Sequence, residues 1–168
     1  MAGTHNHLQV NMIRRHFIAA LGGLFLAHSA ARAADKPAKV AKLKLSDDEW
    51  AKRLTPEAYA VLRHEATERA GSSPLNHEKR RGTFVCAGCD LPLFKSETKY
   101  ESGTGWPSFY DFIPGSLETK TDFKLIYPRK EYHCARCEGH QGHVFDDGPQ
   151  PTGRRYCNNG VALKFVPA

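Results

Sequence analysis

The chain has 168 residues, 40% of them hydrophobic and 25% charged, which fits one soluble globular domain and at most a short extra segment. Its formal net charge of +6 would on its own suggest a nucleic-acid or anionic-membrane partner. Residues 1–33 hold three arginines and no acidic residue, so the rest of the chain carries only +3 and a nucleic-acid partner is not expected.

The first 33 residues have the features of an export signal peptide. Arg14 and Arg15 form a positive start, residues 17–27 (FIAALGGLFLA) form an apolar run too short to span a bilayer, and residues 31–33 (ARA) fit a cleavage site. A retained N-terminal anchor is the alternative, and Met12 is an alternative start. The two arginines match a twin-arginine signal in part, which leaves the export route open. We expect cleavage near Ala33 and export, in a bacterium to the periplasm.

A Lys- and Ala-rich linker is expected over residues 34–45, followed by one domain over residues 46–168 that opens with helices. Ser46 and Glu49 fit a capping box before a short helix over residues 47–53. Thr55 and Pro56 fit the N-cap and the first position of a second helix. The apolar stripe of this second helix is expected at Tyr59, Leu62 and Ala66.

From Gly82 onward the pattern changes to short apolar or aromatic runs that Gly, Pro and Asp separate, which indicates strands. The fold class expected is therefore mainly β, with two small antiparallel sheets, N-terminal helices and a four-cysteine zinc-knuckle site. The runs expected as strands are residues 83–86, 108–113, 123–127, 143–145, 154–157 and 161–166.

Four of the five cysteines form two Cys-x-x-Cys pairs, and each pair follows a strand-like stretch. The pairs are Cys86 with Cys89 and Cys134 with Cys137, separated by 44 residues. Two facing knuckles can supply the four thiolates of a tetrahedral structural zinc site, so one zinc ion is the cofactor expected. Disulfides are an alternative in an exported protein, although such small loops stabilise little. A redox dithiol is the other alternative, although no βαβ pattern surrounds either pair.

The fifth cysteine, Cys157, lies in the stretch GRRYCNNG. In a strand, Arg155, Cys157 and Asn159 would point to one face, and Tyr156 and Asn158 to the other. A cation, a thiol and an amide on one face do not form a core pattern, which argues against a buried structural thiol. A nearby guanidinium is expected to lower the pKa of the thiol and favour the thiolate.

Two further groups have both a structural and a functional interpretation. His140 and His143 are loop residues or spare ligands on pattern alone, and His143 shares a face with Phe145 in a short expected strand. Trp106, extended because a proline follows it, either closes a turn in the core or forms the aromatic wall of a pocket. The acids of the turn at residues 146–149 are expected to be structural.

The segments CAGCDLPLF, KYESGTGWPSF and EYHCARCEGHQGHVFDDGPQPTGRRYCNNGVALKFVP together resemble the methionine-R-sulfoxide reductases of the B type, from about Leu45 to Pro167. The resemblance implies two antiparallel sheets with peripheral helices and a zinc knuckle site. It also implies an enzyme that reduces methionine-R-sulfoxide in oxidised proteins or peptides, through a sulfenic acid on the catalytic cysteine.

The resemblance assigns a role to each candidate residue. Cys157 matches the nucleophile, and His143, with His140 as a second candidate, would help protonate the sulfoxide oxygen. Asn159 and Arg155 match residues that position the thiolate and the polar substrate atoms. The substrate-binding residues implied are Trp106, against which the substrate methyl packs, and Phe145.

One position departs from the common family pattern, because Thr104 stands where many members have a resolving cysteine. We therefore expect an external thiol donor, thioredoxin-like or other, to reduce the sulfenic acid directly. The enzyme is expected to be a monomer. A zinc-ribbon binding module without catalysis would explain the knuckles but not the face of Cys157. A general thiol oxidoreductase would need a second free thiol.

Overall fold

The computed structural model describes residues 39–123 and 128–168. The expected export signal and residues 34–38 of the expected linker lie outside this part. Among the helices of the described residues, none has the length and apolar character needed to cross a membrane.

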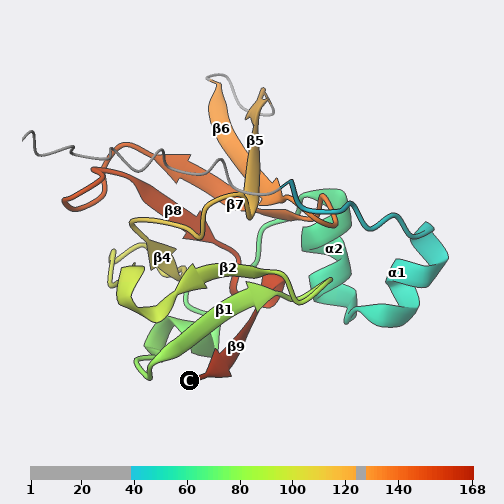
Figure 1. Cartoon of the computed structure of the whole chain (residues 1–168), viewed down its shortest axis with the longest axis horizontal. Coiled ribbons are helices and arrows are strands. Elements are labelled where there is room, and N and C mark those ends of the chain that lie inside the picture. Colours follow the sequence, from blue (N-terminus) through green and yellow to red (C-terminus); the bar gives the residue numbers. More distant parts are fainter. Residues whose placement is uncertain (1–38, 124–127) are drawn as a thin grey trace, which may run out of the picture. The chain divides into compact units, whose positions relative to one another are not determined.

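Two antiparallel sheets form the domain, which confirms the expected fold class (Figure 1). The smaller sheet has the order β2-β1-β9, and the larger has the order β3-β4-β8-β7-β6-β5. The strands are β1 (Gly82–Cys86), β2 (Pro92–Lys95), β3 (Lys99–Tyr100), β4 (Ser108–Phe109), β5 (Leu117–Asp122), β6 (Arg129–Cys134), β7 (His140–Phe145), β8 (Arg155–Asn158) and β9 (Leu163–Pro167).

Between residue 39 and the first strand, two α-helices are present, as the capping signals predicted. In α1 (Asp47–Arg53) the reciprocal capping box of Ser46 and Glu49 is present. In α2 (Pro56–His64) the Thr55 side chain accepts a hydrogen bond from the Ala58 N–H at 3.2 Å. Three short 3₁₀ helices, η1 (Pro74–His77), η2 (Ser96–Thr98) and η3 (Gly160–Ala162), join other elements.

The apolar stripe predicted for α2 is wrong at its end. The helix stops at Glu65, which has a left-handed φ of 55° and caps the helix with hydrogen bonds from its N–H to Ala60 and Val61. Ala66 therefore lies beyond the helix, although it still packs against the core.

The linker prediction is wrong for residues 39–45, the part that the structure describes. Val40, Leu43 and Leu45 pack against the core, and the Leu43 N–H donates to the Arg136 carbonyl at 2.7 Å. Lys42 forms ion pairs with Glu118 and Glu138. The lysines of this segment suggested a solvated linker, but its three apolar residues pack against the core and hold the segment on the domain.

Four strands of the described residues lie outside the predicted runs: β2, β3, β5 and β6, although a strand-like stretch precedes Cys134 in β6. In β2 the apolar signal is only Leu93 and Phe94, both fully buried. Strand β5 is polar along most of its length, because β5 and β6 extend away from the rest of the sheet in Figure 1. The run predicted at residues 123–127 is not supported at Phe123, which follows β5 and is 75% exposed. The rest of that run lies outside the described residues.

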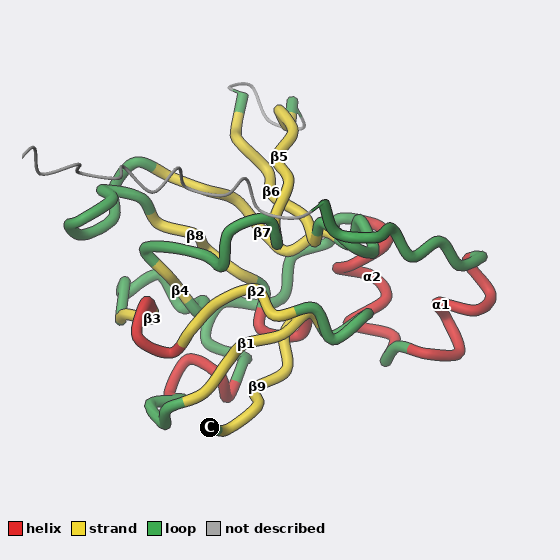
Figure 2. The backbone as a smooth tube through the Cα atoms, in the orientation of Figure 1, coloured by secondary structure: helices red, strands yellow, loops and turns green. Residues whose placement is uncertain are grey.

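An aromatic core lies between the two sheets. In Figure 2 strands β5 to β8 of the larger sheet lie above those of the smaller sheet. Phe84 and Phe94 come from the smaller sheet, and Phe109, Tyr132 and Tyr156 from the larger. All are almost completely buried, and the rings of Phe94 and Phe109 stack with their centroids 4.1 Å apart. Tyr156 therefore packs one face of β8 against this core, and Cys157 projects from the opposite face.

Candidate active site and metal site

The register of the larger sheet aligns a row of polar side chains around Cys157. Cys157 on β8 is paired with His143 on β7 and with Ser108 on β4. Directly paired residues of antiparallel strands project to the same face, so these three side chains share one face. Tyr156 points to the aromatic core, as the period of two predicted.

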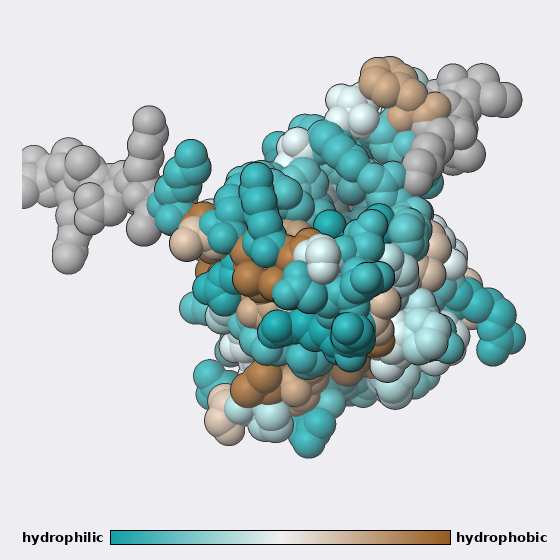
Figure 3. All heavy atoms as spheres, turned by 90° about the vertical axis from the view of Figure 1, so that its right-hand side faces the viewer, coloured by the Kyte–Doolittle hydropathy of each residue, from teal (hydrophilic) through white to brown (hydrophobic). Residues whose placement is uncertain are grey.

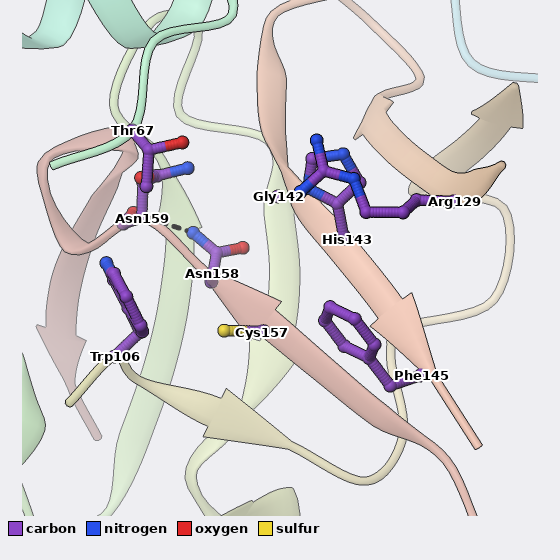
Figure 4. A pocket seen from close by; sticks show the side chains of 9 residues that line it. All are labelled: Thr67, Trp106, Arg129, Gly142, His143, Phe145, Cys157, Asn158 and Asn159. Atoms are coloured by element: carbon purple, nitrogen blue, oxygen red, sulfur yellow. Dashed lines mark hydrogen bonds between the residues drawn. The ribbon is translucent and has the colours of Figure 1, made fainter. Parts of the chain in front are cut away.

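A cavity of about 120 Å³ opens over this row (Figure 4). It is smaller than the roughly 300–1,000 Å³ of a site for a drug-sized ligand, which fits a single side chain better than a cofactor. In Figure 4 the Cys157 sulfur points toward the side where Trp106 lies, and Phe145 lies on the other side. The lining residues are Thr67, Trp106, Arg129, Gly142, His143, Phe145, Cys157, Asn158 and Asn159.

Arg155 lies beside the cavity and is held by the turn after β7. Its guanidinium donates to both carboxylate oxygens of Asp147, at 2.8 and 2.7 Å, and lies 4.4 Å from the ring centroid of Phe145. The expected structural role for an acid of this turn agrees with that ion pair.

The expectation that Cys157 has a lowered pKa is wrong. Burial raises the pKa of the Cys157 thiol above its ordinary value, and the charge of Arg155 and a hydrogen bond from Thr104 oppose this only in part. The free site therefore holds mostly a thiol at neutral pH.

His143 is fixed by two residues of the β5–β6 hairpin. Its Nε2 lies 2.7 Å from Asp122 Oδ2, and the Arg129 guanidinium donates to the same oxygen at 2.7 Å. Burial lowers the pKa of His143, and the hydrogen bond to Asp122 opposes the shift. The imidazole is therefore mostly neutral at pH 7.

His140 lies apart from the cavity lining. Only 3% exposed, it lies with Nδ1 2.9 Å from Glu131 Oε1, and its ring centroid is 5.5 Å from that of His143. This geometry places His140 behind His143 rather than beside the space over Cys157.

Glu68, in the loop after α2, holds two of the cavity residues. Its backbone carbonyl accepts the Trp106 indole N–H at 3.1 Å, and its backbone N–H donates to the Asn159 side chain at 3.0 Å. Its carboxylate accepts the N–H groups of Gly160 and Val161, at 2.6 and 2.9 Å. The Asn159 amide also donates to the Gln141 carbonyl at 3.0 Å, so both ends of this amide are occupied by protein groups.

The four paired cysteines come together as a candidate metal site. Their sulfur atoms lie within 4.8 Å of one another, and all four residues are buried. The two turns are alike: Asp90 and Glu138, each following the second cysteine of its pair, have left-handed φ values of 57° and 59°. Clustering with Cys134 and burial raise the pKa of Cys86 well above its usual range, so a cation is needed for all four sulfurs to be thiolates.

A chain of side-chain amides connects the candidate metal site with β8. The Gln141 amide donates to the Cys86 sulfur at 3.4 Å, and its oxygen accepts from the Asn158 amide at 3.4 Å. The Asn158 oxygen in turn accepts from the Tyr132 hydroxyl at 2.8 Å. All three polar side chains are fully buried, so each needs these partners.

Thus Cys157, His143, Asn159, Trp106 and Phe145 line one cavity, Arg155 lies beside it, and His140 lies behind it. The sequence did not single out Asp122, Arg129, Thr67 or Glu68. They come from segments 28 or more residues away from Cys157, so only the fold brings them to the site.

One family model and several known proteins match this chain. The SelR domain model matches residues 54–167. The chain is 54% identical over 122 residues to "Peptide methionine sulfoxide reductase B1, chloroplastic" of Arabidopsis thaliana, a match that covers 72% of this chain and 60% of that protein. It is 53% identical over 121 residues to "Peptide methionine sulfoxide reductase MsrB" of Methanosarcina barkeri, with 71% and 85% covered. It is 47% identical over 131 residues to "Methionine-R-sulfoxide reductase B3, mitochondrial" of Mus musculus, with 77% and 52% covered.

Proposed function

Since the chain belongs to the SelR family of methionine-R-sulfoxide reductases, type B, we propose that it reduces methionine-R-sulfoxide in proteins or peptides to methionine through Cys157. The observation that carries the proposal is the placement of the Cys157 thiol in a small cavity with Trp106 on one side and His143 and Phe145 on the other. A methionine sulfoxide side chain has an apolar methyl group, which matches the aromatic rings, and a polar S=O group, which matches the imidazole.

In the proposed reaction the Cys157 thiolate attacks the sulfoxide sulfur. The sulfoxide oxygen takes up a proton and ends on Cys157 as a sulfenic acid, and methionine leaves. The substrate sulfur gains two electrons and the cysteine sulfur loses two.

His143 is the candidate proton donor, because it is paired with Cys157 across the sheet and lines the cavity. A neutral imidazole whose Nε2 faces Asp122 donates poorly, so the proton of the Cys157 thiol must pass to His143 as the thiolate forms. His140 would then act through Glu131 and His143 rather than on the substrate.

The other predicted residues receive positioning roles. Trp106 and Phe145 would contact the substrate methyl group, and Arg155 would stabilise the thiolate. Asn159 would hold the end of β8, because both ends of its side-chain amide are bonded to the protein.

An external thiol, thioredoxin-like or other, is the proposed reductant of the sulfenic acid. The four other cysteines converge on the candidate metal site, and Thr104 offers no thiol. Mass spectrometry after one turnover without reductant should find a sulfenic acid on Cys157. An internal disulfide would refute this step.

Zinc is the proposed occupant of the four-cysteine site, with a structural role. Four buried sulfur ligands suit Zn²⁺ better than hard cations such as Mg²⁺ or Ca²⁺, and they leave no open position for catalysis. The site would join β1 and β2 of one sheet to β6 and β7 of the other.

Export of a monomer, by cleavage near Ala33 and in a bacterium to the periplasm, is proposed from the sequence of residues 1–33. The face of the domain around α1 and α2 is largely hydrophilic, with separate apolar patches (Figure 3). Fractionation of expressing cells and N-terminal sequencing of the product test the export.

Separated R and S epimers of a methionine sulfoxide peptide test the proposed activity. With a chemical dithiol, only the R epimer should be reduced, and Cys157→Ser should abolish the reaction. Metal content and circular dichroism of the variant should match the parent chain. Reduction of the S epimer, or substantial activity in the variant, would contradict the proposal.

A further inference from the structure

Three hydroxyl groups form a hydrogen-bonded chain beside Cys157. The Thr104 hydroxyl lies 2.9 Å from the Ser102 hydroxyl, which lies 2.8 Å from the Ser108 hydroxyl. The Ser108 hydroxyl donates to the Trp106 carbonyl oxygen at 3.2 Å. Ser108 is 1% exposed, so its hydroxyl depends on these protein partners.

Both ends of this hydroxyl chain lie near the nucleophile. Ser108 on β4 is directly paired with Cys157 on β8. At the other end, the Thr104 hydroxyl favours the charged form of Cys157. The chain of hydroxyls therefore runs from Ser108, the residue paired with Cys157 across the sheet, to Thr104, the hydroxyl that acts on the thiol.

Counting protons fixes the direction of the hydrogen bonds. Each hydroxyl has one proton, and a carbonyl oxygen can only accept. When Ser108 donates to the Trp106 carbonyl, Ser102 must donate to Ser108 and Thr104 to Ser102. The Thr104 oxygen is then an acceptor for the Cys157 S–H, which is the arrangement that suits the thiol.

The thiolate requires the opposite direction. Thr104 must donate to the sulfur, so it must accept from Ser102, which must accept from Ser108. All three hydroxyls can turn without moving their oxygen atoms, and bonds within such a chain strengthen one another. The only bond given up is that from Ser108 to the Trp106 carbonyl.

We propose that Thr104, Ser102 and Ser108 form a hydroxyl relay that reverses its direction when the Cys157 proton leaves, to His143 in the proposed reaction, with Thr104 as the donor to the thiolate. The hydroxyl groups only turn, and no proton passes along the relay itself. This inference rests on the proposed function in that Cys157 is the nucleophile. It assigns a function to Thr104, which stands where many family members have a resolving cysteine: its hydroxyl stabilises the thiolate of Cys157.

The loop that carries the relay is held in place from two sides. The Gly105 carbonyl accepts from the Gly71 N–H at 2.7 Å and from the Asn76 side chain at 3.0 Å. Gly105 has a φ of +88°, and a Cβ there would approach the Gly71 nitrogen to 3.0 Å. The Glu101 carboxylate accepts the Gly103 N–H at 2.8 Å. These contacts keep the oxygens of Ser102 and Thr104 at fixed positions.

Other groups also act on the ionisation of Cys157, and the test must separate them from the relay. Arg155 favours the thiolate, and Asp147 opposes it. The titratable or charged side chains near Cys157 come from β3, β6, β7, β8 and the turn after β7: Tyr100, Arg129, Tyr132, His143, Arg155 and Asp147. Substitution of Thr104 leaves all of them in place.

The test is the pH dependence of iodoacetamide alkylation at Cys157, followed by mass spectrometry of the peptide that contains it. Thr104→Val keeps the branched shape and removes the hydroxyl, and Thr104→Ser keeps the hydroxyl. Thr104→Val should move the midpoint of the alkylation curve upward by about one pH unit, because a hydrogen bond to a charged group contributes roughly 1.5–3 kcal/mol. Thr104→Ser should keep the midpoint near that of the parent chain.

Ser102→Ala tests the relay one step from the sulfur, since it removes the donor that supports Thr104. It should raise the midpoint by less than Thr104→Val. Thr119→Val, on the exposed part of β5, is the matched control and should leave the midpoint unchanged. An unchanged midpoint in Thr104→Val, or equal midpoints in Thr104→Val and Thr104→Ser, would overturn the proposal. Because alkylation needs no reductase activity, the result does not depend on whether the proposed reaction is correct.

Discussion

At the scale of single residues, the reactivity of Cys157 is a balance between burial and a few polar groups. Burial favours the thiol, while the Arg155 guanidinium and the Thr104 hydroxyl favour the thiolate. The result is a small thiolate fraction at neutral pH for a thiol, the proposed nucleophile, that lies in a cavity lined by Trp106 and Phe145.

Replacing Arg155 with Met should raise the pKa of Cys157 further, because the positive charge that favours the thiolate is lost. The midpoint of Cys157 alkylation in the parent chain should lie above the roughly 8.5 of a free cysteine, and that of Arg155→Met should lie higher still. Arg154→Met removes a neighbouring charge on an exposed side chain and should have a much smaller effect. A lower midpoint in Arg155→Met would contradict this account.

His143 should titrate below its ordinary value of about 6.5, because burial disfavours the imidazolium. A nuclear magnetic resonance titration measures this directly. In Asp122→Asn the midpoint should fall further, since the hydrogen bond that favours the charged ring loses its carboxylate. Asp111→Asn, on an exposed loop, serves as the control. A midpoint that rises in Asp122→Asn would show that Asp122 does not favour the charged imidazole.

At the scale of elements, the loop after α2 and the end of β8 form one assembly through Glu68. Its main chain holds Trp106 and Asn159, and its carboxylate accepts the first two N–H groups of η3. A short helix start with few other partners benefits from such an acceptor. The aromatic wall and the strand that carries Cys157 are therefore positioned by the same residue.

Glu68→Ala should lower the free energy of unfolding by about 1–3 kcal/mol, because two partly buried N–H groups lose a charged acceptor. Glu68→Gln should lose less, since one amide oxygen can still accept. Urea unfolding measures the stability of both variants. The KM for the R-sulfoxide should also rise in Glu68→Ala, because the Trp106 indole is positioned by this loop. Glu57→Gln on the exposed start of α2 is the matched control. Equal stability of Glu68→Ala and Glu57→Gln would rule out the assembly.

At the scale of the whole domain, the four paired cysteines bring turns of the two sheets to one cluster of sulfur atoms. Cys86 and Cys89 lie where β1 turns into β2, and Cys134 and Cys137 where β6 turns into β7. We expect a bound metal to add to the stability, because it would join the two sheets at a second point besides the aromatic core.

Removal of the metal with a strong chelator should lower Tm by at least about 10 °C, since a loss of only ~3 kcal/mol has roughly that effect on a domain of this size. Cys86→Ser should do the same without chelator, and Cys157→Ser should retain both metal and Tm. Calorimetry and metal analysis of the same samples measure the effect. A chelated domain with an unchanged Tm would exclude a stabilising metal.

The amino-acid sequence by itself determined the features that depend on local patterns. The capping residues Ser46 and Thr55 placed both helices, the two Cys-x-x-Cys pairs predicted the knuckles, and the period of two in RRYC separated Cys157 from Tyr156. These signals are local, because a cap, a tight turn and a strand each depend on residues only a few positions apart.

Only the tertiary structure decided what depends on burial and on distant partners. It reversed the direction of the pKa shift of Cys157, because the cost of burying a charge depends on all the elements packed around the thiol. It left His140 out of the cavity lining, beside Glu131 and in ring contact with His143. It brought Asp122, Glu68 and the hydroxyl of Thr104 to the site through sheet register and loop contacts, and these are set by the packing of segments far apart in the chain.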